Sequence, residues 1–258
     1  MTRNTRIMVA PNGARLQKSD HPAVPISATE LARTALECRA AGADALHLHV
    51  RDAQGGHSLD PDLYRAAIAA VEQAMPDMPI QITTEAAGRY DFGDQMRLLD
   101  ALRPAAASIA IRETARAPDE AARFYARALH QGISIQHIAY GAPCLAQLAR
   151  WFADQTVPAP MRDVILVLGQ YAPPRAARPP NLAPLLRAAR TADLRVTVCA
   201  FGPAEQDCLI EAARHGCDLR VGFENNLVSP DGSVWRTNAD AVAALRATLD
   251  KAFGGCAA

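Results

Sequence analysis

Short apolar runs alternate with longer amphipathic segments along the chain. Runs rich in branched apolar residues predict strands at 7–10, 44–50, 80–84, 106–109, 133–138, 163–168, 194–200 and 218–223. Between them, apolar residues recur three and four positions apart, which predicts helices at 29–41, 61–75, 94–102, 119–130, 144–154, 182–191, 204–215 and 238–252. Such alternation is typical of parallel strands joined by crossovers. Eight units favour an α/β fold that closes into a (β/α)8 TIM barrel.

One such barrel is expected to take up the whole chain, residues 1–258, as a single domain. Barrels of this kind commonly contain about 250 residues, and half of the residues here are apolar. No G-x-G-x-x-G follows the first strand, which argues against an open dinucleotide-binding sheet. The Pro- and Arg-rich stretch 169–180 directly follows the sixth strand, so we interpret it as a βα loop and not as a domain linker.

Alternation within the predicted strands assigns polar side chains to the barrel interior. His47 and His49 are two positions apart on an apolar strand, so both imidazoles face the same side, and Arg51 is expected to face the barrel interior with them. Arg220 and Glu224 share the inner face of the eighth strand in the same way. The inner faces of the third and fifth strands carry Gln81, Thr83, Glu85, Ser134 and Gln136. Branched apolar residues fill a barrel that only has to be packed, so these polar residues predict a site.

Two imidazoles and one carboxylate form a candidate metal site. In a closed barrel of eight strands, the second and eighth strands both flank the first, which brings Glu224 within reach of His47 and His49. Two histidines and a glutamate with one position left open are typical of catalytic zinc. We therefore predict that these residues bind Zn²⁺. Arg220 is costly to bury unless a carboxylate or a substrate anion offsets its charge.

Composition favours a small-molecule ligand. The chain carries 27 basic and 27 acidic residues, so no net field attracts nucleic acid or an anionic membrane surface. The six cysteines form no C-x-x-C pair, which suits a reduced cytoplasmic protein. No run approaches ~18 apolar residues, and no long apolar signal region opens the chain. We expect a soluble, cytoplasmic protein that binds neither nucleic acid nor membranes.

Four motifs, in order along the chain, resemble those of the β-keto acid cleavage enzyme family. They are Ala10-Pro-Asn-Gly-Ala-Arg15, Asp20-His-Pro22, His47-Leu-His-Val-Arg-Asp52 and Arg220-Val-Gly-Phe-Glu-Asn-Asn226. The resemblance implies a (β/α)8 barrel with zinc held by His47, His49 and Glu224. It also implies that a β-keto acid is condensed with acetyl-CoA and cleaved at a carbon–carbon bond, giving acetoacetate and a new CoA thioester. The family's oligomers imply a homotetramer.

The resemblance assigns roles to further residues. Arg220 would stabilise an oxyanion or orient the thioester, and Thr83 would hold the substrate carboxylate. Arg175 and Arg178, in the Pro- and Arg-rich loop, are expected to bind the co-substrate acetyl-CoA. The expected substrate contacts are Asn12, Ser108, Arg112, Glu113 and Gln136.

Several positions depart from the family pattern. Asn225 replaces the acidic residue that follows the zinc glutamate and cannot serve as a general base. Thr83-Thr-Glu85 replaces Ser-Thr-Gly on the third strand, and Ala110-Ile-Arg-Glu113 replaces the pattern on the fourth. A fifth-strand glutamate is replaced by Gln136. Glu85 and Glu113 are candidates for the missing carboxylate, and Arg112 for binding a second anion. The catalytic candidates are Arg220, Thr83, Glu85 and Asn225.

Three other functions remain open. One is a metal-dependent aldolase or lyase that acts on a keto acid without CoA. A second is a metal-dependent hydrolase, although such barrels typically carry H-x-H on the first strand and an aspartate on the eighth, unlike this chain. The third is a non-catalytic metal-binding homologue, which Asn225 and Gln136 keep open. Turnover with and without acetyl-CoA separates these alternatives.

Overall fold

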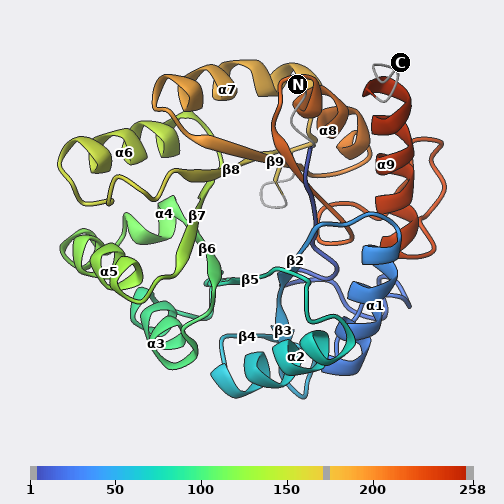
Figure 1. Ribbon diagram of the computed structural model, residues 1–258, viewed down its shortest axis with the longest axis horizontal. Coiled ribbons are helices and arrows are strands. Elements are labelled where there is room, and N and C mark those ends of the chain that lie inside the picture. Colours follow the sequence, from blue (N-terminus) through green and yellow to red (C-terminus); the bar gives the residue numbers. More distant parts are fainter. Residues whose placement is uncertain (1–4, 171–174, 254–258) are drawn as a thin grey trace.

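Eight parallel strands close into a barrel in the computed structural model, which describes residues 5–170 and 175–253 (Figure 1). Around the barrel the strand order is β1-β10-β9-β8-β7-β6-β5-β2. Each predicted strand overlaps one of these, so the (β/α)8 barrel is confirmed. The barrel strands are β1 (Ile7–Val9), β2 (Ala45–Leu48), β5 (Ile80–Thr83), β6 (Ala106–Ala110), β7 (Ser134–Ala139), β8 (Asp163–Leu168), β9 (Arg195–Ala200) and β10 (Asp218–Val221).

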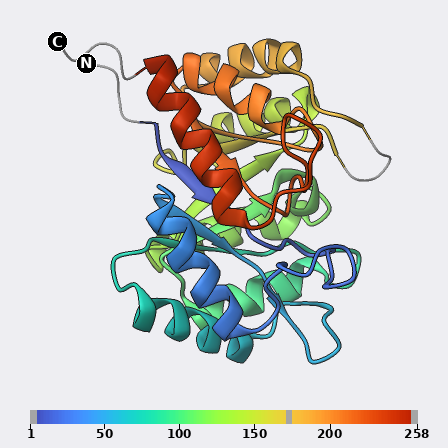
Figure 2. The same ribbon diagram turned by 90° about the vertical axis from the view of Figure 1, so that its right-hand side faces the viewer.

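The helices form a ring outside the barrel. Each predicted helix overlaps an observed one, and two short elements are additional, α4 and the 3-10 helix η1. The helices are α1 (Ala28–Ala40), α2 (Pro61–Ala74), α3 (Phe92–Leu102), α4 (Ile111–Thr114), α5 (Pro118–His130), α6 (Ala142–Ala153), η1 (Pro179–Asn181), α7 (Leu182–Thr191), α8 (Glu205–Arg214) and α9 (Asn238–Phe253). Figure 2 shows α1 and α9 next to each other outside β1, where the ring closes. No helix among the described residues is long and apolar enough to cross a membrane.

Local sequence signals explain where the first helices begin. The Ser27 side chain accepts a hydrogen bond from the Glu30 backbone N–H, and the Glu30 carboxylate accepts one from the Ser27 backbone N–H. This capping box satisfies backbone donors that a helix start leaves without partners. Asp60 caps α2 in a similar way, and Pro61 occupies the first turn, where its missing N–H costs nothing.

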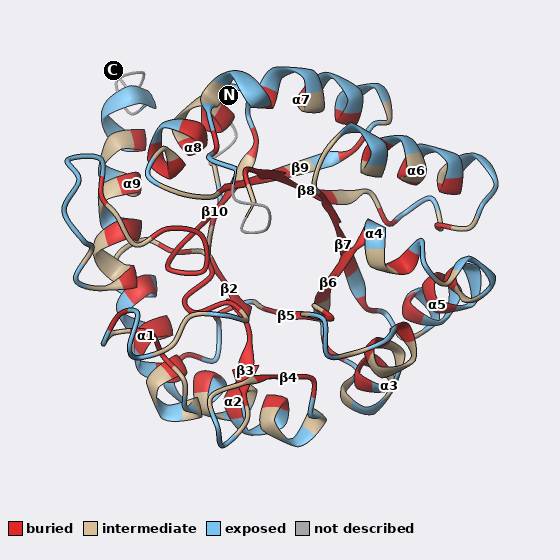
Figure 3. Ribbon diagram, turned by 180° about the vertical axis from the view of Figure 1, so that it is seen from behind, coloured by how far each residue is buried: buried red, intermediate tan, exposed pale blue. Residues whose placement is uncertain are grey.

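Apolar side chains form two layers, one on each side of the barrel wall. The larger cluster lies between strands and helices and includes Leu46, Leu48 and Ile82. Their burial agrees with the outward orientation that alternation predicts. Figure 3 shows buried residues concentrated on the barrel strands and on the helix faces turned toward them. The smaller interior cluster contains Ala110, Ile138, Ile165, Val167 and Cys199.

The second barrel strand ends two residues earlier than the sequence predicts. β2 ends at Leu48, so His49 lies just beyond it. The chain then forms β3 (Val50–Arg51), which pairs antiparallel with β4 (His57–Ser58) outside the barrel. Arg51 was expected to face the barrel interior with the histidines, and this is wrong. Its guanidinium donates hydrogen bonds to the carbonyls of Asn12 and Gly13, because leaving the barrel turns it toward the loop after β1.

Gly222, just after β10, allows the chain to turn tightly against the end of β1. Its φ is +141°, and a Cβ atom at this position would lie 2.4 Å from the carbonyl oxygen of Ala10. Only glycine tolerates this combination of dihedral and close approach. Because the turn ends the eighth strand, it also fixes where the Glu224 carboxylate lies.

Replacing Gly222 by alanine should lower the free energy of unfolding by about 3 kcal/mol, since backbone strain and overpacking each cost roughly 1–3 kcal/mol. Gly132→Ala is the matched control, because its φ is also positive but no atom lies within 4 Å of the added Cβ. It should cost only about 1–2 kcal/mol. Urea unfolding of both variants measures the difference. Equal losses would show that contact with Ala10 does not constrain this turn.

Candidate metal centre

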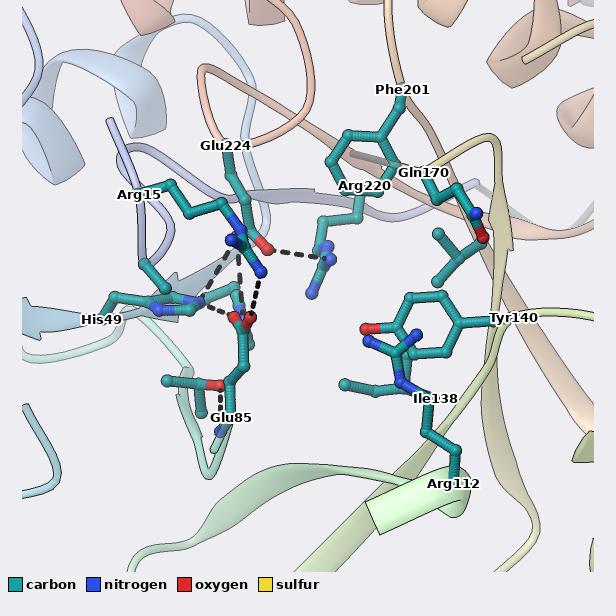
Figure 4. A pocket seen from close by; sticks show the side chains of 14 residues that line it. Arg15, His49, Glu85, Arg112, Ile138, Tyr140, Gln170, Phe201, Arg220 and Glu224 are labelled. Carbon is teal, nitrogen blue, oxygen red and sulfur yellow. Dashed lines mark hydrogen bonds and ion pairs between the residues drawn. The ribbon is translucent and has the colours of Figure 1, made fainter. Parts of the chain in front are cut away.

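A pocket opens at the carboxyl ends of the barrel strands (Figure 4). This is the end where (β/α)8 barrels place their active sites. The pocket is lined by Ala14, Arg15, His47, His49, Thr83, Glu85, Arg112, Ile138, Tyr140, Val167, Gln170, Phe201, Arg220 and Glu224. Candidates from distant strands thus share one cavity.

Three buried side chains converge in this pocket. The Nε2 atoms of His47 and His49 are 3.2 Å apart. Oε2 of Glu224 lies 3.8 Å from Nε2 of His47 and 3.6 Å from Nε2 of His49. One ligand atom from each residue lies within 4.8 Å of the other two. The three residues therefore form a possible metal site, with two imidazole nitrogens and one carboxylate oxygen turned toward a common space.

Burial keeps both imidazoles neutral. It lowers the pKa of His47 well below the ordinary value, with a further contribution from the charge of Arg220. Burial, followed by the nearby His57, lowers the pKa of His49 in the same direction. A neutral imidazole offers a lone pair to a cation, whereas an imidazolium does not. The donor set therefore fits a divalent metal ion.

A chain of side-chain amides orients His47. Nδ1 of His47 lies 2.9 Å from Oε1 of Gln81. The Gln81 amide nitrogen donates to Oε1 of Gln136 at 3.3 Å, and that of Gln136 donates to the Thr197 hydroxyl at 3.1 Å. With its nitrogen used in this way, Gln81 presents its oxygen to His47. The Nδ1 proton is therefore held at Gln81, which leaves the Nε2 lone pair free to bind a metal.

The turn that carries Glu224 is held from two neighbouring elements. The Glu205 carboxyl, at the start of α8, accepts hydrogen bonds from the backbone N–H of Gly222 and from the Asn226 amide. Burial raises the pKa of Glu205 well above its ordinary value. Asn238, at the start of α9, accepts from the Phe223 backbone N–H and donates to the carbonyl of Pro11. These contacts join the turn to the loop after β1.

Arg220 is buried beside the carboxylate of Glu224. Its Nη2 lies 3.2 Å from Oε1 of Glu224. Burial opposes the charge of the guanidinium, but the Glu224 carboxylate offsets this and keeps the pKa of Arg220 above its ordinary value. Nε and Nη1 of Arg220 have no hydrogen-bond partner among the described residues. Buried donors of this kind favour an anionic ligand in the pocket.

Glu85 is a second carboxyl group in the pocket, just beyond β5. Burial, with contributions from the carboxylates of Glu224 and Glu113, raises its pKa to about 7. Nη2 of Arg15 lies 3.9 Å from Oε1 of Glu85. The Thr83 hydroxyl accepts a hydrogen bond from the Glu85 backbone N–H, and Thr83 also lines the pocket. A carboxyl group with a pKa near neutrality is suited to general acid–base chemistry.

The remaining residues expected at the site lie outside the pocket lining. Asn12 donates to the carbonyls of Pro25 and His49, and so supports the backbone of a ligand residue. Ser108 is buried inside the barrel wall, and Gln136 belongs to the amide chain beneath His47. Asn225 is buried, and neither atom of its side-chain amide has a hydrogen-bond partner among the described residues.

Glu113 and the loop arginines also lie outside the lining. The Glu113 carboxylate accepts from the Gln95 amide and the Ala86 backbone N–H, away from the pocket. Arg175 pairs with Gln170, a lining residue, through two backbone hydrogen bonds, which places it at the rim. Arg178 is exposed just before η1. Residues 171–174 of the same loop lie outside the described residues.

Sequence reasoning missed several residues that form or support the site. Tyr140, Gln170 and Phe201 line the pocket just beyond β7, β8 and β9. Their position at strand ends was a signal that could have been used, because βα loops carry the sites of these barrels. Glu205 and Asn238 act from helix starts. No spacing in the sequence shows that they reach the Glu224 turn.

Comparison with known families gives a match along nearly the whole chain. A model of the family described as beta-keto acid cleavage enzyme matches residues 4–255. A 3-keto-5-aminohexanoate cleavage enzyme from Fusobacterium nucleatum is 40% identical over 72 residues, which is 28% of this chain and 26% of that protein. A 3-oxoadipate:acetyl-CoA acetyltransferase from Cupriavidus necator is 34% identical over 110 residues, or 43% of this chain and 38% of that protein. The chain thus spans roughly a quarter to two fifths of the curated relatives' lengths.

Solved structures with the same fold support the barrel assignment. A structure described as a ternary complex of ObcA with a C4-CoA adduct and oxalate superposes with a TM-score of 0.72 at 16% sequence identity. The match covers 90% of this chain and 64% of that one. At this level of identity the likeness concerns the fold alone.

Replacing Gln81 by leucine should weaken binding of Zn²⁺ or Co²⁺ about 10- to 100-fold, because the amide that holds Nδ1 of His47 is lost. Gln206→Leu is the matched control, since this buried glutamine donates to the carbonyl of Ala241, outside the pocket lining. Isothermal titration calorimetry on metal-free protein measures the affinities, and thermal unfolding checks that both variants fold. An unchanged affinity in Gln81→Leu would remove the amide chain from the description of the metal site.

Proposed function

This protein belongs to the beta-keto acid cleavage enzyme family, whose model matches residues 4–255, and from this we propose that it is a zinc-dependent enzyme that cleaves a β-keto acid with acetyl-CoA. The observation that carries the proposal is the convergence of His47, His49 and Glu224 in the pocket at the barrel's carboxyl end. The names of the relatives describe cleavage of a keto acid and transfer of an acetyl group between a keto acid and acetyl-CoA.

The proposed reaction exchanges acyl groups between two substrates. The bond between C2 and C3 of the β-keto acid breaks, and the acyl group that contains C3 becomes bonded to the sulfur of CoA. The acetyl group leaves CoA and becomes bonded to C2, which keeps its carboxylate, so the products are acetoacetate and a new CoA thioester. No oxidant or reductant is needed. A proton must leave the carbon that acts as the nucleophile, so the site requires a base.

His47, His49 and Glu224 would hold the zinc ion. Two histidines and one glutamate are a typical set of protein ligands in catalytic zinc sites. A zinc ion bound there would supply Lewis acidity toward the keto group of the substrate. The chain's own contribution is to keep the imidazoles neutral by burial and to orient His47 through Gln81.

Arg220 would bind the oxygen atoms that carry negative charge during the reaction. Nη2 is engaged with Glu224, while Nε and Nη1 lack partners among the described residues. The Glu224 contact fixes the guanidinium in place before substrate arrives. Donors held in advance near developing charge stabilise it without reorganisation. Thr83 also lines the pocket, and its hydroxyl group would donate a hydrogen bond to the substrate carboxylate.

Glu85 is the residue that we propose as the base. Of the two carboxylates considered as replacements for the acidic residue missing at Asn225, Glu85 lines the pocket, whereas Glu113 is bonded to Gln95 outside it. The Glu85 carboxylate would accept the proton from the carbon nucleophile and return it to product. The guanidinium of Arg15, 3.9 Å from the Glu85 carboxylate, favours the charged form of Glu85, which is needed to remove the proton from the carbon nucleophile.

Acetyl-CoA would approach across the rim of the pocket. Arg175 and Arg178 are exposed near that rim and would interact with its phosphates. A homotetrameric assembly and a cytoplasmic location stay predictions of the sequence.

A screen of short β-keto acids on zinc-loaded protein, with and without acetyl-CoA, tests the function. We expect acetoacetate and a new CoA thioester only when acetyl-CoA is present. Cleavage without acetyl-CoA would instead establish the aldolase or lyase alternative. Metal binding without any turnover would establish a non-catalytic homologue.

His49→Ala should lose both stoichiometric zinc and turnover, because two remaining ligands leave an inadequate site. His137→Ala is the matched control, since this buried histidine bonds to Tyr125 and to the carbonyl of Met161 and does not line the pocket. It should lose stability but keep its metal. Elemental analysis and circular dichroism provide the two readouts. Retained stoichiometric zinc in a folded His49→Ala protein would refute the ligand assignment.

Glu85→Gln should lower kcat about 10²- to 10⁴-fold, the usual contribution of a positioned base. Because catalysis requires the charged form of the Glu85 carboxyl, the wild-type rate should rise with pH up to about 7, the pKa of Glu85. A bound cation that lowers this pKa moves the rise to lower pH. The variant should lack this acidic limb. Glu113→Gln, the control, should keep the rate and an acidic limb, which shifts to lower pH because the Glu113 carboxylate contributes to the raised pKa of Glu85. Equal effects of the two substitutions would contradict the assignment.

A further inference from the structure

The wall of the pocket opposite the metal ligands is largely apolar and aromatic, whereas the wall that carries the ligands is polar. The opposite wall is formed by Arg112, in α4, and by Ile138, Tyr140, Val167, Gln170 and Phe201, at or just beyond the ends of β7 to β9. In Figure 4 Arg112, Ile138, Tyr140, Gln170 and Phe201 lie across the cavity from His49, Glu224 and Glu85. A substrate bound at the metal ligands therefore extends its far end toward a largely apolar and aromatic surface that contains one arginine and one glutamine.

Arg112 is held in place by an aromatic ring. Its guanidinium carbon lies 3.7 Å from the centroid of the Tyr140 ring. Stacking of this kind fixes the plane of the guanidinium and leaves the N–H groups at its edges available. Those edges match the two oxygens of a carboxylate, which arginine binds with a pair of parallel hydrogen bonds.

Arg112 forms no ion pair with a carboxylate among the described residues, whereas Arg220 pairs with Glu224. The adjacent Glu113 is turned toward the Gln95 amide and the Ala86 backbone N–H instead. Arg112 is an exposed residue that lines the pocket, so a ligand can reach its guanidinium. It is thus a positive charge, stacked on the Tyr140 ring, that an anionic ligand in the pocket can contact.

We propose that the pocket selects a β-keto acid whose far end carries a second carboxylate, and that Arg112 binds this carboxylate. The inference rests on the proposed function for the orientation of the substrate, because the metal ligands and Arg220 would bind the β-keto acid end. A cationic far end would meet the like charge of Arg112. A neutral alkyl end would contact the apolar wall but gain no ionic contact.

A phosphate of CoA is the other anion that Arg112 would recognise. Two features favour the substrate as the source. Arg112 lines the pocket beside Ile138 and Tyr140, whereas Arg175 and Arg178 are available to the nucleotide at the rim. The two sources also predict different results, because loss of a phosphate contact weakens acetyl-CoA binding whatever the keto acid is.

The experiment compares three keto acids of equal chain length: 3-oxoadipate, 3-oxohexanoate and 5-amino-3-oxohexanoate, with anionic, neutral and cationic far ends. Binding to zinc-loaded protein is measured by calorimetry without acetyl-CoA, and kcat/KM is measured with it. We expect wild-type protein to bind 3-oxoadipate about 10- to 100-fold more tightly than 3-oxohexanoate, as expected for a charge-assisted pair. Arg112→Leu should remove that preference and leave the affinity for 3-oxohexanoate within about threefold of the wild-type value.

Two variants serve as controls. Arg116→Leu removes an exposed arginine that follows α4 and does not line this pocket, and it should keep the preference. Arg112→Lys keeps the positive charge but lacks the planar guanidinium, so it should keep part of the preference for 3-oxoadipate. Tighter binding of the neutral or the cationic acid by the wild-type protein would overturn the inference. It would also be overturned if Arg112→Leu lowered kcat/KM equally for all three acids by raising the KM of acetyl-CoA. Selective binding without turnover would support the inference and refute only the proposed function.

Discussion

Closure of the barrel through β1 is the constraint on which the site depends. β1 pairs with β2 on one side and with β10 on the other. The pairing brings His47 and His49, near the start of the chain, to Glu224, near its end. α1 and α9 pack together outside the same strand. The ligand set is therefore built only when the last strand closes the barrel, so folding and metal binding are coupled.

Burial converts these neighbouring side chains into a site with defined charge. Away from water the two imidazoles stay neutral, and the Glu224 carboxylate and the Arg220 guanidinium stabilise each other. The ligands thus bring one negative charge, which favours a divalent cation over a neutral ligand. Arg220 then faces the same cavity with donors left for an anion. Interactions of this kind are much stronger in a closed pocket than in water, which is why the barrel has to bury them.

The sequence was sufficient for the barrel and for the convergence of the three ligands, because both follow from periodicity and strand order. It failed where the chain leaves the regular strand: Arg51 turns out of the barrel because β2 ends at Leu48. Arg112 lies in α4 and Tyr140 just beyond β7, and their stacking depends on tertiary geometry that no local pattern encodes. Asn238 likewise reaches the site from a helix start.

The most direct test of the central claim is the coordination shell of the zinc-loaded protein, measured by X-ray absorption at the zinc edge. The account predicts two imidazole nitrogens at roughly 2.0–2.1 Å, one carboxylate oxygen at roughly 2.0–2.2 Å and an additional oxygen from solvent. A variant that lacks either ligand histidine should hold no stoichiometric zinc, so this coordination shell should be absent from it. A sulfur neighbour at about 2.3 Å, which would implicate the buried Cys199 beside Arg220, or a shell without imidazole scattering would contradict the account.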